Sequence, residues 1–561
     1  MEVEELLDIL FKNRFFDKNQ QDVFLNPSYE KHIHDPFLLK DMDKACTRIK
    51  EAISKKEKIV IYSDYDCDGI PAAVIMNDFF KKINYENFYI YIPDRHDEGY
   101  GLNIDAVNNF IKEKVNLIIT FDLGTTAIEE IALAGENGID IIVTDHHLPK
   151  KDINNKDLLP NAYAIINPKQ EACHYPDDRL CGSALAFKLV CAYIKKYEED
   201  LDLPNGWEKW LLDMVGLATL ADQVPLLGEN RVLAFYGLKV LQKSKRLGLV
   251  DIFRKAKVSI QTLNEEDITF TLAPRLNACS RMDSPMRAFE LLSTIDPIES
   301  RTLADFVEKI NTDRKTNVAH IMKDVRKNLD KKLIEENLMP IVVIGNPSWK
   351  VGVLGIVASK ITEVYKRPAF VWGGDDVIRG SCRSFGDVNL VDIMTKVEKS
   401  FINFGGHKQA GGFSVSNEEI HFLDENLNNA YINIKENNKE IYEEVTDYNI
   451  DTTLSLDDVD QKRYEVIARL SPFGISNPKP VFLFEKLKIF EIKEFGKEKN
   501  HLEIIFLNSK NKPVKAIMFF KTRSDFPKKL EIASTIDLVA SFEESFFANR
   551  RELRLRIVDI L

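Results

Sequence analysis

The sequence lacks the features of several classes of protein. No apolar stretch approaches the roughly 18 residues of a membrane-spanning helix, and the acidic start, Met1 to Glu5, does not have the pattern of a signal peptide. The seven cysteines are an odd number, scattered and without a C-x-x-C pair, which indicates a reduced cytoplasm. The net charge is −12, so the basic excess of a protein that wraps nucleic acid is also missing.

What remains is an ordinary globular composition in a long chain. Of the 561 residues, 44% are hydrophobic and 29% are charged, and the length suffices for about three to five domains. We expect an N-terminal accessory segment, a catalytic domain, a long connecting helix, a second α/β domain and a C-terminal β domain. Their expected bounds are residues 1–57, 58–296, 297–337, 338–437 and 450–561.

Strand and helix patterns alternate over the first third of the chain. Short β-rich runs at 58–63, 88–93, 116–121 and 139–144 are separated by stretches of helical composition. Such alternation predicts βαβ units and a parallel sheet. A second α/β pattern begins at Pro340, and five short alternating runs from residue 481 onward predict a small β-barrel. The predicted fold class is therefore α/β, with two α/β domains joined by a long helix and followed by a barrel.

Acidic residues gather where the predicted strands end. Asp64, Asp66 and Asp68 alternate along an extended turn after the first strand, which directs alternate carboxylates to the same side. The turn could instead cap the next helix, or belong to a calcium loop, but the glutamate at the twelfth position of a calcium loop is missing. We interpret the cluster as metal ligands.

Three further clusters also follow apolar runs. Asp122 alone is more typical of a helix N-cap, and Asp222 alone is a weak signal. Asp145, His146 and His147 come after the strand at 139–144, and two imidazoles after an acid indicate a site. Together, carboxylate and imidazole ligands suit Mn²⁺ or Mg²⁺, and bridging carboxylates suit two ions about 3.5–4 Å apart, as in phosphoryl transfer.

The order of these motifs resembles the DHH phosphoesterase superfamily, whose signature here is Asp145-His146-His147. The series D-x-D-x-D-G, D-x-G, D-H-H and A-D matches it from Asp64 to Asp222. Later motifs resemble the bacterial RecJ family of single-strand-specific exonucleases. They are PRLNACSRMD at 274–283, GVLGIVAS at 352–359, FGGH at 404–407 and SPFGISNP at 471–478. The resemblance covers nearly the whole chain and implies a DHH domain, a DHH-associated α/β domain and an OB-like C-terminal domain that binds nucleic acid.

The resemblance also implies an activity and its residues. We expect a 5′→3′ exonuclease of single-stranded DNA, in repair and recombination, that uses two Mn²⁺ or Mg²⁺ ions. The ligands implied by motif matching are Asp66, Asp68, Asp122, His146 and Asp222. Asp145 would lie close behind them and Asp64 would support them. His147 would contact the scissile phosphate or assist proton transfer.

Donors for the phosphates of a substrate are predicted in several turns and small-residue loops. They are Arg95, Arg275, Asn277, Arg281, Ser381, Arg383 and His407. Each arginine could equally be an ordinary surface residue in a tight turn. The resemblance implies that Ser381 and Arg383 recognise a 5′-terminal phosphate, with Arg281 and Arg95 nearby, and that His407 holds a phosphate near the metals. A narrow cleft between the two α/β domains would admit one strand and exclude a duplex.

Aromatic residues of the C-terminal domain allow two interpretations. They suit a base-stacking groove, with Arg550 and Arg551 adding charge, but the more common role of such side chains is barrel core. The residues concerned are Phe482, Phe484, Phe519, Phe520, Phe542, Phe546 and Phe547.

Two other functions remain open at this point. A DHH phosphodiesterase acting on short oligonucleotides or cyclic dinucleotides would share the acid motifs, but such enzymes generally lack the bridging region and the terminal barrel. A single-strand-binding scaffold that has lost activity would not need all the acid motifs, which are intact here. By resemblance alone, we expect single-stranded DNA, a RecQ-type helicase and a single-strand-binding protein as partners, and no membrane.

Overall fold

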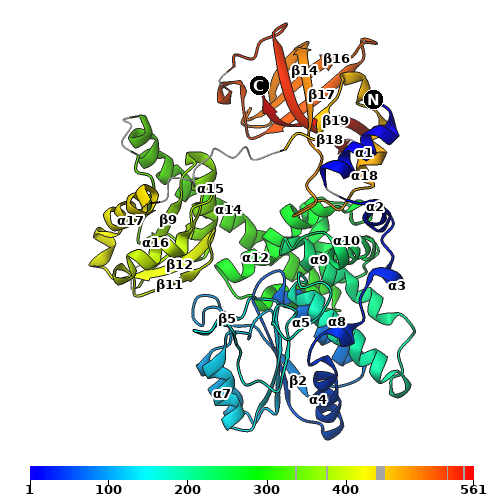
Figure 1. Cartoon of the computed structure of the whole chain (residues 1–561), viewed down its shortest axis with the longest axis vertical. Helices are drawn as coiled ribbons and strands as arrows, with labels where there is room; N and C mark the ends of the chain where they lie inside the picture. Colours follow the sequence, from blue (N-terminus) through cyan, green and yellow to red (C-terminus); the bar gives the residue numbers. More distant parts are fainter. Residues whose placement is uncertain (15, 335–337, 375–376, 438–448, 527, 548–549) are drawn as a thin grey trace.

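The computed structural model describes residues 1–14, 16–334, 338–374, 377–437, 449–526, 528–547 and 550–561. Three units are each built on a five- or seven-stranded sheet. In Figure 1 the C-terminal sheet lies at the top and the first α/β unit at the bottom. The second α/β unit lies to one side, at the end of α14 (Pro297–Ile334). No helix in the described part of the chain is long and apolar enough to cross a membrane.

The first unit is the predicted parallel sheet, in the order β2-β1-β3-β4-β7. Its strands are β1 (Ile59–Ser63), β2 (Phe88–Tyr91), β3 (Leu117–Phe121), β4 (Asp140–Thr144) and β7 (Ala164–Ile166). The short strand β7 was not predicted. The strand order reverses between β1 and β3, and ligands of such sheets bind outside the carboxyl ends of the strands at this point.

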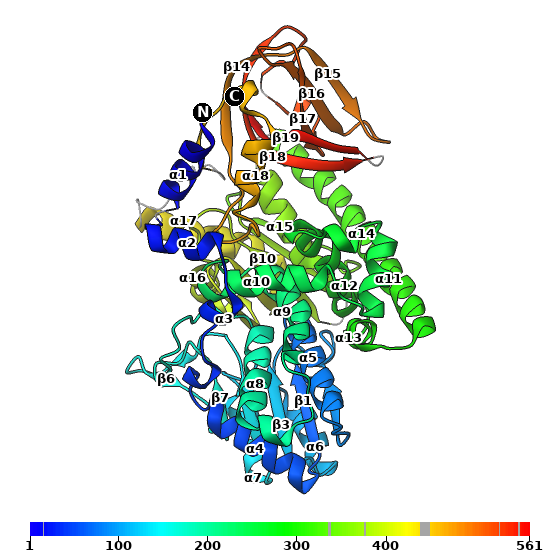
Figure 2. The ribbon, with the colours of Figure 1, turned by 90° about the vertical axis from the view of Figure 1, so that its right-hand side faces the viewer.

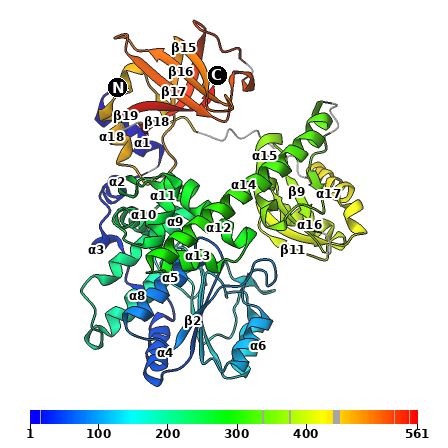
Figure 3. The same cartoon turned by 180° about the vertical axis from the view of Figure 1, so that it is seen from behind.

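Helices cover both faces of this sheet, as Figure 3 shows. Ile59 and Ile61 pack in one core and Val60 and Tyr62 in another, because successive strand residues point to opposite faces. The first core includes residues of α4 (Met42–Lys55), α5 (Gly69–Lys82) and α8 (Gly182–Lys196), and the second those of α6 (Ile104–Lys112) and α7 (Ile128–Glu136). Strands buried on both faces are expected to be mostly apolar, as are β1 and β3, whose residues are all buried.

A helical layer follows the sheet in the chain. It contains α9 (Leu212–Ala221), α10 (Gly228–Leu241), α11 (Leu247–Ala256), a π-helical turn (Asp267–Leu272), α12 (Ala273–Met282) and α13 (Met286–Ser293). Two glycines let α9 and α10 touch through their backbones. A Cβ on Gly216 would lie 2.6 Å from Cα of Gly237, so neither position has room for a side chain. This contact fixes α9, which ends beside Asp222.

The second α/β unit has a mixed sheet in the order β11-β12-β10-β9-β8, in which only β8 and β9 pair in parallel. Its strands are β8 (Val342–Gly345), β9 (Ala369–Gly373), β10 (Ile378–Arg383), β11 (Asn403–Gly406) and β12 (Ala410–Val415). Its helices are α15 (Leu354–Tyr365), α16 (Leu390–Lys396) and α17 (Leu423–Asn437). The long helix expected at 297–337 is present as α14, and residues 335–337 lie outside the described residues. The predicted loops around Ser381 and Gly405 are strand residues of β10 and β11.

The C-terminal unit is a seven-stranded sheet in the order β13-β14-β18-β19-β17-β16-β15. Its elements are β13 (Thr452–Thr453), α18 (Gln461–Ala468), β14 (Phe482–Lys488), β15 (Glu491–Phe495), β16 (His501–Leu507), β17 (Pro513–Phe519), β18 (Thr535–Phe547) and β19 (Arg550–Ile560). Among the described residues β13 and β15 stay at the ends of the sheet, so the hydrogen-bonded pairs do not close the predicted barrel.

The phenylalanines of this unit divide between core and surface. Phe482, Phe484 and Phe542 are completely buried in its core, so the core interpretation holds for them and the stacking groove does not. Phe520 is 80% exposed. The side chains of Phe546, Phe547 and Arg550 lie outside the described residues.

The N-terminal segment begins beside the C-terminal unit, and Figure 2 shows it running down one side of the molecule toward the first α/β unit. Residues of α1 (Val3–Asn13) and α2 (Lys18–Leu25) pack in the core of the C-terminal unit. Arg231 of α10 fixes this junction. Its buried guanidinium donates to the carbonyl oxygens of Phe24, Leu470 and Ser471 at 2.8, 3.1 and 3.1 Å.

Candidate metal centre

The four acid clusters meet in one cavity of about 230 Å³. Because β1, β3 and β4 are parallel, the residues that follow them emerge at the same edge of the sheet, and the end of α9 brings Asp222 to that edge. The side chains that line the cavity are Asp64, Tyr65, Asp66, Arg95, Tyr100, Asp122, His146, His147, Asp222, Asn277 and Arg281.

Ligand atoms within this cavity form three overlapping sets. The sets are Asp64–Asp66–Asp122, Asp68–His146–Asp222 and Asp122–His146–His147, and the ligand atoms of each set lie within 4.8 Å of one another. His146 Nε2 lies 3.0 Å from Asp122 Oδ1, 3.6 Å from Asp68 Oδ2 and 3.9 Å from Asp222 Oδ2. Asp122 and His146 each belong to two sets, so both could serve as metal ligands. Asp64, expected to support the ligands from behind, lies among them.

The electrostatics of these residues fit divalent cations. The Oδ1 atom of Asp64 is buried and has no hydrogen-bond partner among the described residues. The Oδ1 atom of Asp122 is also buried and is approached by His146 Nε2 at 3.0 Å, but the two atoms do not form a hydrogen bond. Burial and the charge of Asp66 raise the pKa of Asp64 well above its usual range, and burial and Asp68 do the same for Asp122. Burial and the same Asp68 raise the pKa of Asp222 to about 8. Crowded carboxylates of this kind need a counter-charge, and a mixed carboxylate and imidazole set suits Mn²⁺ or Mg²⁺.

Asp145 belongs to none of the three sets and instead forms a hydrogen bond with His147. Its Oδ1 accepts from His147 Nδ1 at 2.8 Å and from the backbone N–H of His146 at 2.7 Å, and its Oδ2 accepts from the N–H of Thr125 at 2.9 Å. Burial alone would lower the pKa of His147, but the hydrogen bond to Asp145 raises it to about 9. Asp145 therefore orients the imidazole of His147.

The beginning of α8 was missed by the sequence reasoning. The backbone N–H groups of Gly182 and Ser183 donate to Asp68 Oδ2 and Oδ1 at 2.5 and 2.7 Å. A Cβ on Gly182 would lie 2.7 Å from Cβ of Asp122, so only glycine lets the helix approach this closely. The free N–H groups at the start of a helix stabilise a carboxylate. A Gly-Ser pair before an apolar helical run was the only signal for this role.

Two polar side chains beside the His pair were missed as well. The hydroxyl of Tyr100 lies 3.3 Å from both the carbonyl oxygen of Asp122 and Nδ1 of His147. Asn167, just after β7, donates to the carbonyl oxygen of His147 at 2.8 Å. Neither residue belongs to a motif, and both reach the site only through the packing of the sheet.

Two arginines, Arg95 and Arg281, line the same cavity as the acids. Arg95 lies over the ring of Tyr65, 5.1 Å from its centroid, and Arg281 Nη1 donates to the carbonyl oxygen of Gly352 at 3.4 Å. Burial and repulsion by Arg95 lower the pKa of Arg281 to about 10. Arg383 contributes to the same repulsion, although it does not itself line the cavity. Arg95, Arg281 and Arg383 form no ion pair among the described residues. Such a cluster is suited to an anion.

The remaining predicted substrate residues are not all brought to this cavity. Ser381 and Arg383 both lie close to Gly355. A Cβ on this glycine would lie 3.0 Å from Arg383 Nη2 and 3.6 Å from Ser381 Oγ. Asn277 lines the cavity, and its Oδ1 is buried without a partner among the described residues.

Arg275 and His407 lie elsewhere. Arg275 Nε is paired with Glu308 Oε2 of α14 at 2.6 Å, and the residue does not line the cavity. His407, between β11 and β12, is exposed and does not line the cavity either. Their roles in binding phosphate stay predictions.

Three domain families match the chain in order. The DHH family, N-terminal domain, matches residues 58–219, the DHHA1 domain matches residues 338–439, and the RecJ OB domain matches residues 450–559. The sheet, the metal centre and the C-terminal unit therefore have the organisation of a DHH-type protein with an OB domain.

Curated relatives narrow this class. The chain is 32% identical over 562 residues to the single-stranded-DNA-specific exonuclease RecJ of Bacillus subtilis, covering 100% of this chain and 68% of the relative. It is 30% identical over 515 residues to the RecJ of Haemophilus influenzae, covering 89% and 86%. The chain therefore belongs to the RecJ family.

Solved structures agree with this fold. The RecJ of Thermus thermophilus in complex with Mn²⁺ has a TM-score of 0.81 at 23% identity, covering 100% of this chain and 77% of that one. An exonuclease RecJ bound to manganese has a TM-score of 0.60 at 28% identity, covering 70% and 95%.

Proposed function

We propose that the chain hydrolyses single-stranded DNA from its 5′ end, with two Mn²⁺ or Mg²⁺ ions, in DNA repair and recombination. The observation that carries the proposal is one cavity that holds the carboxylate and imidazole residues together with Arg95 and Arg281, which form no ion pair among the residues that the structure describes. The carboxylate and imidazole residues suit phosphoryl transfer, and the arginines suit the phosphates of the strand. The curated relatives are named as single-stranded-DNA-specific exonucleases.

The chain's own residues would divide the work as follows. Asp66, Asp68, Asp122, His146 and Asp222 would hold the ions, with Asp64 as a further candidate. When bound, the ions supply an activated water and stabilise the charge that develops on the phosphate.

The two histidines have separate tasks in this proposal. His146 is a ligand, and His147 contacts the scissile phosphate. With Nδ1 of His147 held by Asp145, its Nε2 is the nitrogen available to a phosphate oxygen. Arg95, Arg281, Ser381 and Arg383 would bind the 5′-terminal phosphate and so place the first phosphodiester bond at the ions.

Digestion of end-labelled DNA tests this function. A 5′-labelled single strand should release labelled mononucleotide first, a 3′-labelled strand should shorten gradually, and a blunt duplex should resist. Excess chelator should abolish the activity and Mn²⁺ should restore it. Rapid hydrolysis of dinucleotides or cyclic dinucleotides with little action on long strands would favour the small-substrate phosphodiesterase. Binding of the strand without cleavage under any divalent ion would favour the scaffold.

Partners and location follow from the family in the same way. We propose that a RecQ-type helicase supplies the single strand and that a single-strand-binding protein presents it, in the cytoplasm. Stimulation of digestion on a duplex by such a helicase is the measurement that checks this.

A further inference from the structure

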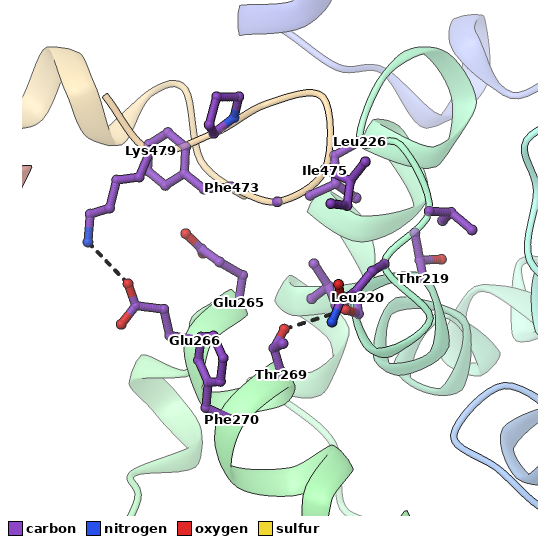
Figure 4. Close-up of a pocket in the computed structure, with 14 residues that line it drawn as sticks. Thr219, Leu220, Leu226, Glu265, Glu266, Thr269, Phe270, Phe473, Ile475 and Lys479 are labelled. Atoms are coloured by element: carbon purple, nitrogen blue, oxygen red, sulfur yellow. Dashed lines mark hydrogen bonds and ion pairs between the residues drawn. The ribbon is translucent and has the colours of Figure 1, made fainter. Parts of the chain in front are cut away.

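A second cavity, of about 260 Å³, opens between the catalytic unit and the chain that leads into the C-terminal sheet. One side is the turn between α9 and α10, another is the π-helical turn, and the third is the segment 471–479, which precedes β14 (Figure 4). The backbone N–H of Leu226 donates to the carbonyl oxygen of Ile475 at 2.9 Å, which fixes the segment against the α9–α10 turn. π-helical turns are rare and are frequently found at functional sites.

Consecutive residues line this cavity and the cavity of the metal centre. Asp222 lines the metal cavity, and the next residue, Gln223, lines the second cavity. Gln223 has a φ of +58°, in the left-handed region, so the chain turns sharply between the two residues. A strand whose 5′ end lies at the ions and which continues toward the C-terminal sheet would pass this turn.

The chemistry of the second cavity differs from that of the first. Figure 4 shows Phe473 and Phe270 on opposite sides, with the carboxylate of Glu265 between them. Phe270 is 74% exposed although it is a large apolar side chain. Glu265 is only 9% exposed, and its Oε2 accepts from the hydroxyl of Ser471 at 3.1 Å.

The charges of the lining residues exclude a phosphate as the occupant. Glu265 and Glu266 are acidic, and the one cation among the described lining residues, Lys479, is paired with Glu266 at 3.2 Å. Two aromatic faces and a buried acceptor instead match a nucleobase, which stacks on rings and presents amino groups at its edge.

We propose that this cavity binds one base of the DNA strand, on the 3′ side of the bond that is cut, by stacking on Phe270 and Phe473 and by hydrogen bonding to Glu265. The inference rests on the proposed function. In that function the metal cavity contacts only the phosphates of the strand, and the second cavity adds a contact with a base. It predicts that one position of the strand matters for its base as well as its phosphate.

A scan with a single abasic nucleotide locates that position. The KM for the first cleavage should rise about 5- to 150-fold at one position of the scan, because base–aromatic stacking contributes about 1–3 kcal/mol per base. Phe270→Ala should raise KM for an intact strand to a similar extent and add little when the strand is abasic at that position. Phe270→Trp should restore the wild-type value. Phe422→Ala is the matched control, because Phe422 is 56% exposed on the second α/β unit, and it should leave KM unchanged.

Base identity tests the role of Glu265. A carboxylate only accepts hydrogen bonds, so cytosine, which donates through its amino group, should bind at the located position about tenfold more tightly than thymine, whose N3–H lies between two carbonyl oxygens that repel a carboxylate. Glu265→Gln offers a donor as well and should remove most of this difference.

Binding measured without cleavage separates this inference from the proposed function. 2-Aminopurine placed along the strand, with protein in excess chelator, should lose fluorescence at the located position in the wild type and not in Phe270→Ala. A flat abasic scan, or equal effects of Phe270→Ala and Phe422→Ala, overturns the base site while digestion continues. No digestion at all overturns the proposed function, and the fluorescence scan still decides whether the cavity takes a base.

Discussion

Replacing Gly182 by alanine should weaken the metal centre from a helix end that contributes no ligand. A Cβ at this position would lie 2.7 Å from Cβ of Asp122 and 3.1 Å from Oδ2 of Asp68. Non-bonded carbons at their best separation are about 3.5–4.0 Å apart, so the first contact is short by about 1 Å. Both neighbours are proposed ligands, so any relief of the clash must displace a ligand or the beginning of α8.

The size of the effect follows from these contacts. An extra methyl group in a packed interior typically costs about 1–3 kcal/mol. Loss of the groups that orient ligands typically lowers metal affinity about 10- to 100-fold, or about 1.4–2.8 kcal/mol. We therefore expect Gly182→Ala to raise the dissociation constant for Mn²⁺, and the Mn²⁺ concentration for half-maximal activity, by about 10- to 100-fold.

Gly135→Ala provides the matched control. Gly135 lies in α7, and a Cβ there would have nothing within 4 Å. This change should stabilise the fold by about 0.4–1 kcal/mol and leave Mn²⁺ affinity unchanged. Calorimetric titration with Mn²⁺ measures affinity in both variants, and thermal unfolding measures stability. If Gly182→Ala binds Mn²⁺ as tightly as the wild type, the close approach of α8 does not matter and the reasoning is wrong.

Three other substitutions test separate parts of the molecule. Asp145→Asn should lower kcat about 10- to 100-fold with little change in KM, because it loosens the His147 imidazole; single-turnover kinetics should show the loss in the chemical step, and a loss confined to KM would contradict it. Arg383→Ala should weaken binding of a 5′-phosphorylated strand about 10- to 150-fold, the range of one charge-assisted hydrogen bond, and an equal loss for a 5′-hydroxyl strand would count against a terminal phosphate site. Arg231→Met should destabilise the fold by about 2–5 kcal/mol in urea unfolding, because buried carbonyl oxygens lose their donor; an unchanged midpoint would show that the junction does not depend on Arg231.

Much of the metal centre could be predicted from the sequence, because the residues that follow parallel strands lie at the same edge of the sheet. Asp66, Asp122 and His146 each follow an apolar run in the sequence and meet in the structure, where His146 Nε2 and Asp122 Oδ1 are 3.0 Å apart. Parallel pairing of β1, β3 and β4 makes this convergence a consequence of periodicity and order. The long connecting helix was predictable because an unusually long stretch of the chain is rich in helix-forming residues.

The directions of side chains that depend on a partner far away in the sequence could not be predicted. Arg275 and Arg281 lie in the same short motif on α12, yet Arg275 turns to Glu308 and Arg281 faces the cavity. The C-terminal sheet was expected to close into a barrel, but the strand pairs among the described residues leave β13 and β15 as its two edges.

The sequence by itself therefore determined the parallel sheet, the acid and histidine residues at its edge and the family of the chain. These features depend on the order of apolar and polar residues within short stretches of the chain, which the sequence shows directly. Only the tertiary structure decided that α8 donates its first N–H groups to Asp68, that α1 and α2 complete the core of the C-terminal unit, and that a second cavity opens beside Asp222. Each of these joins segments more than a hundred residues apart or depends on how such segments pack, which no local pattern records.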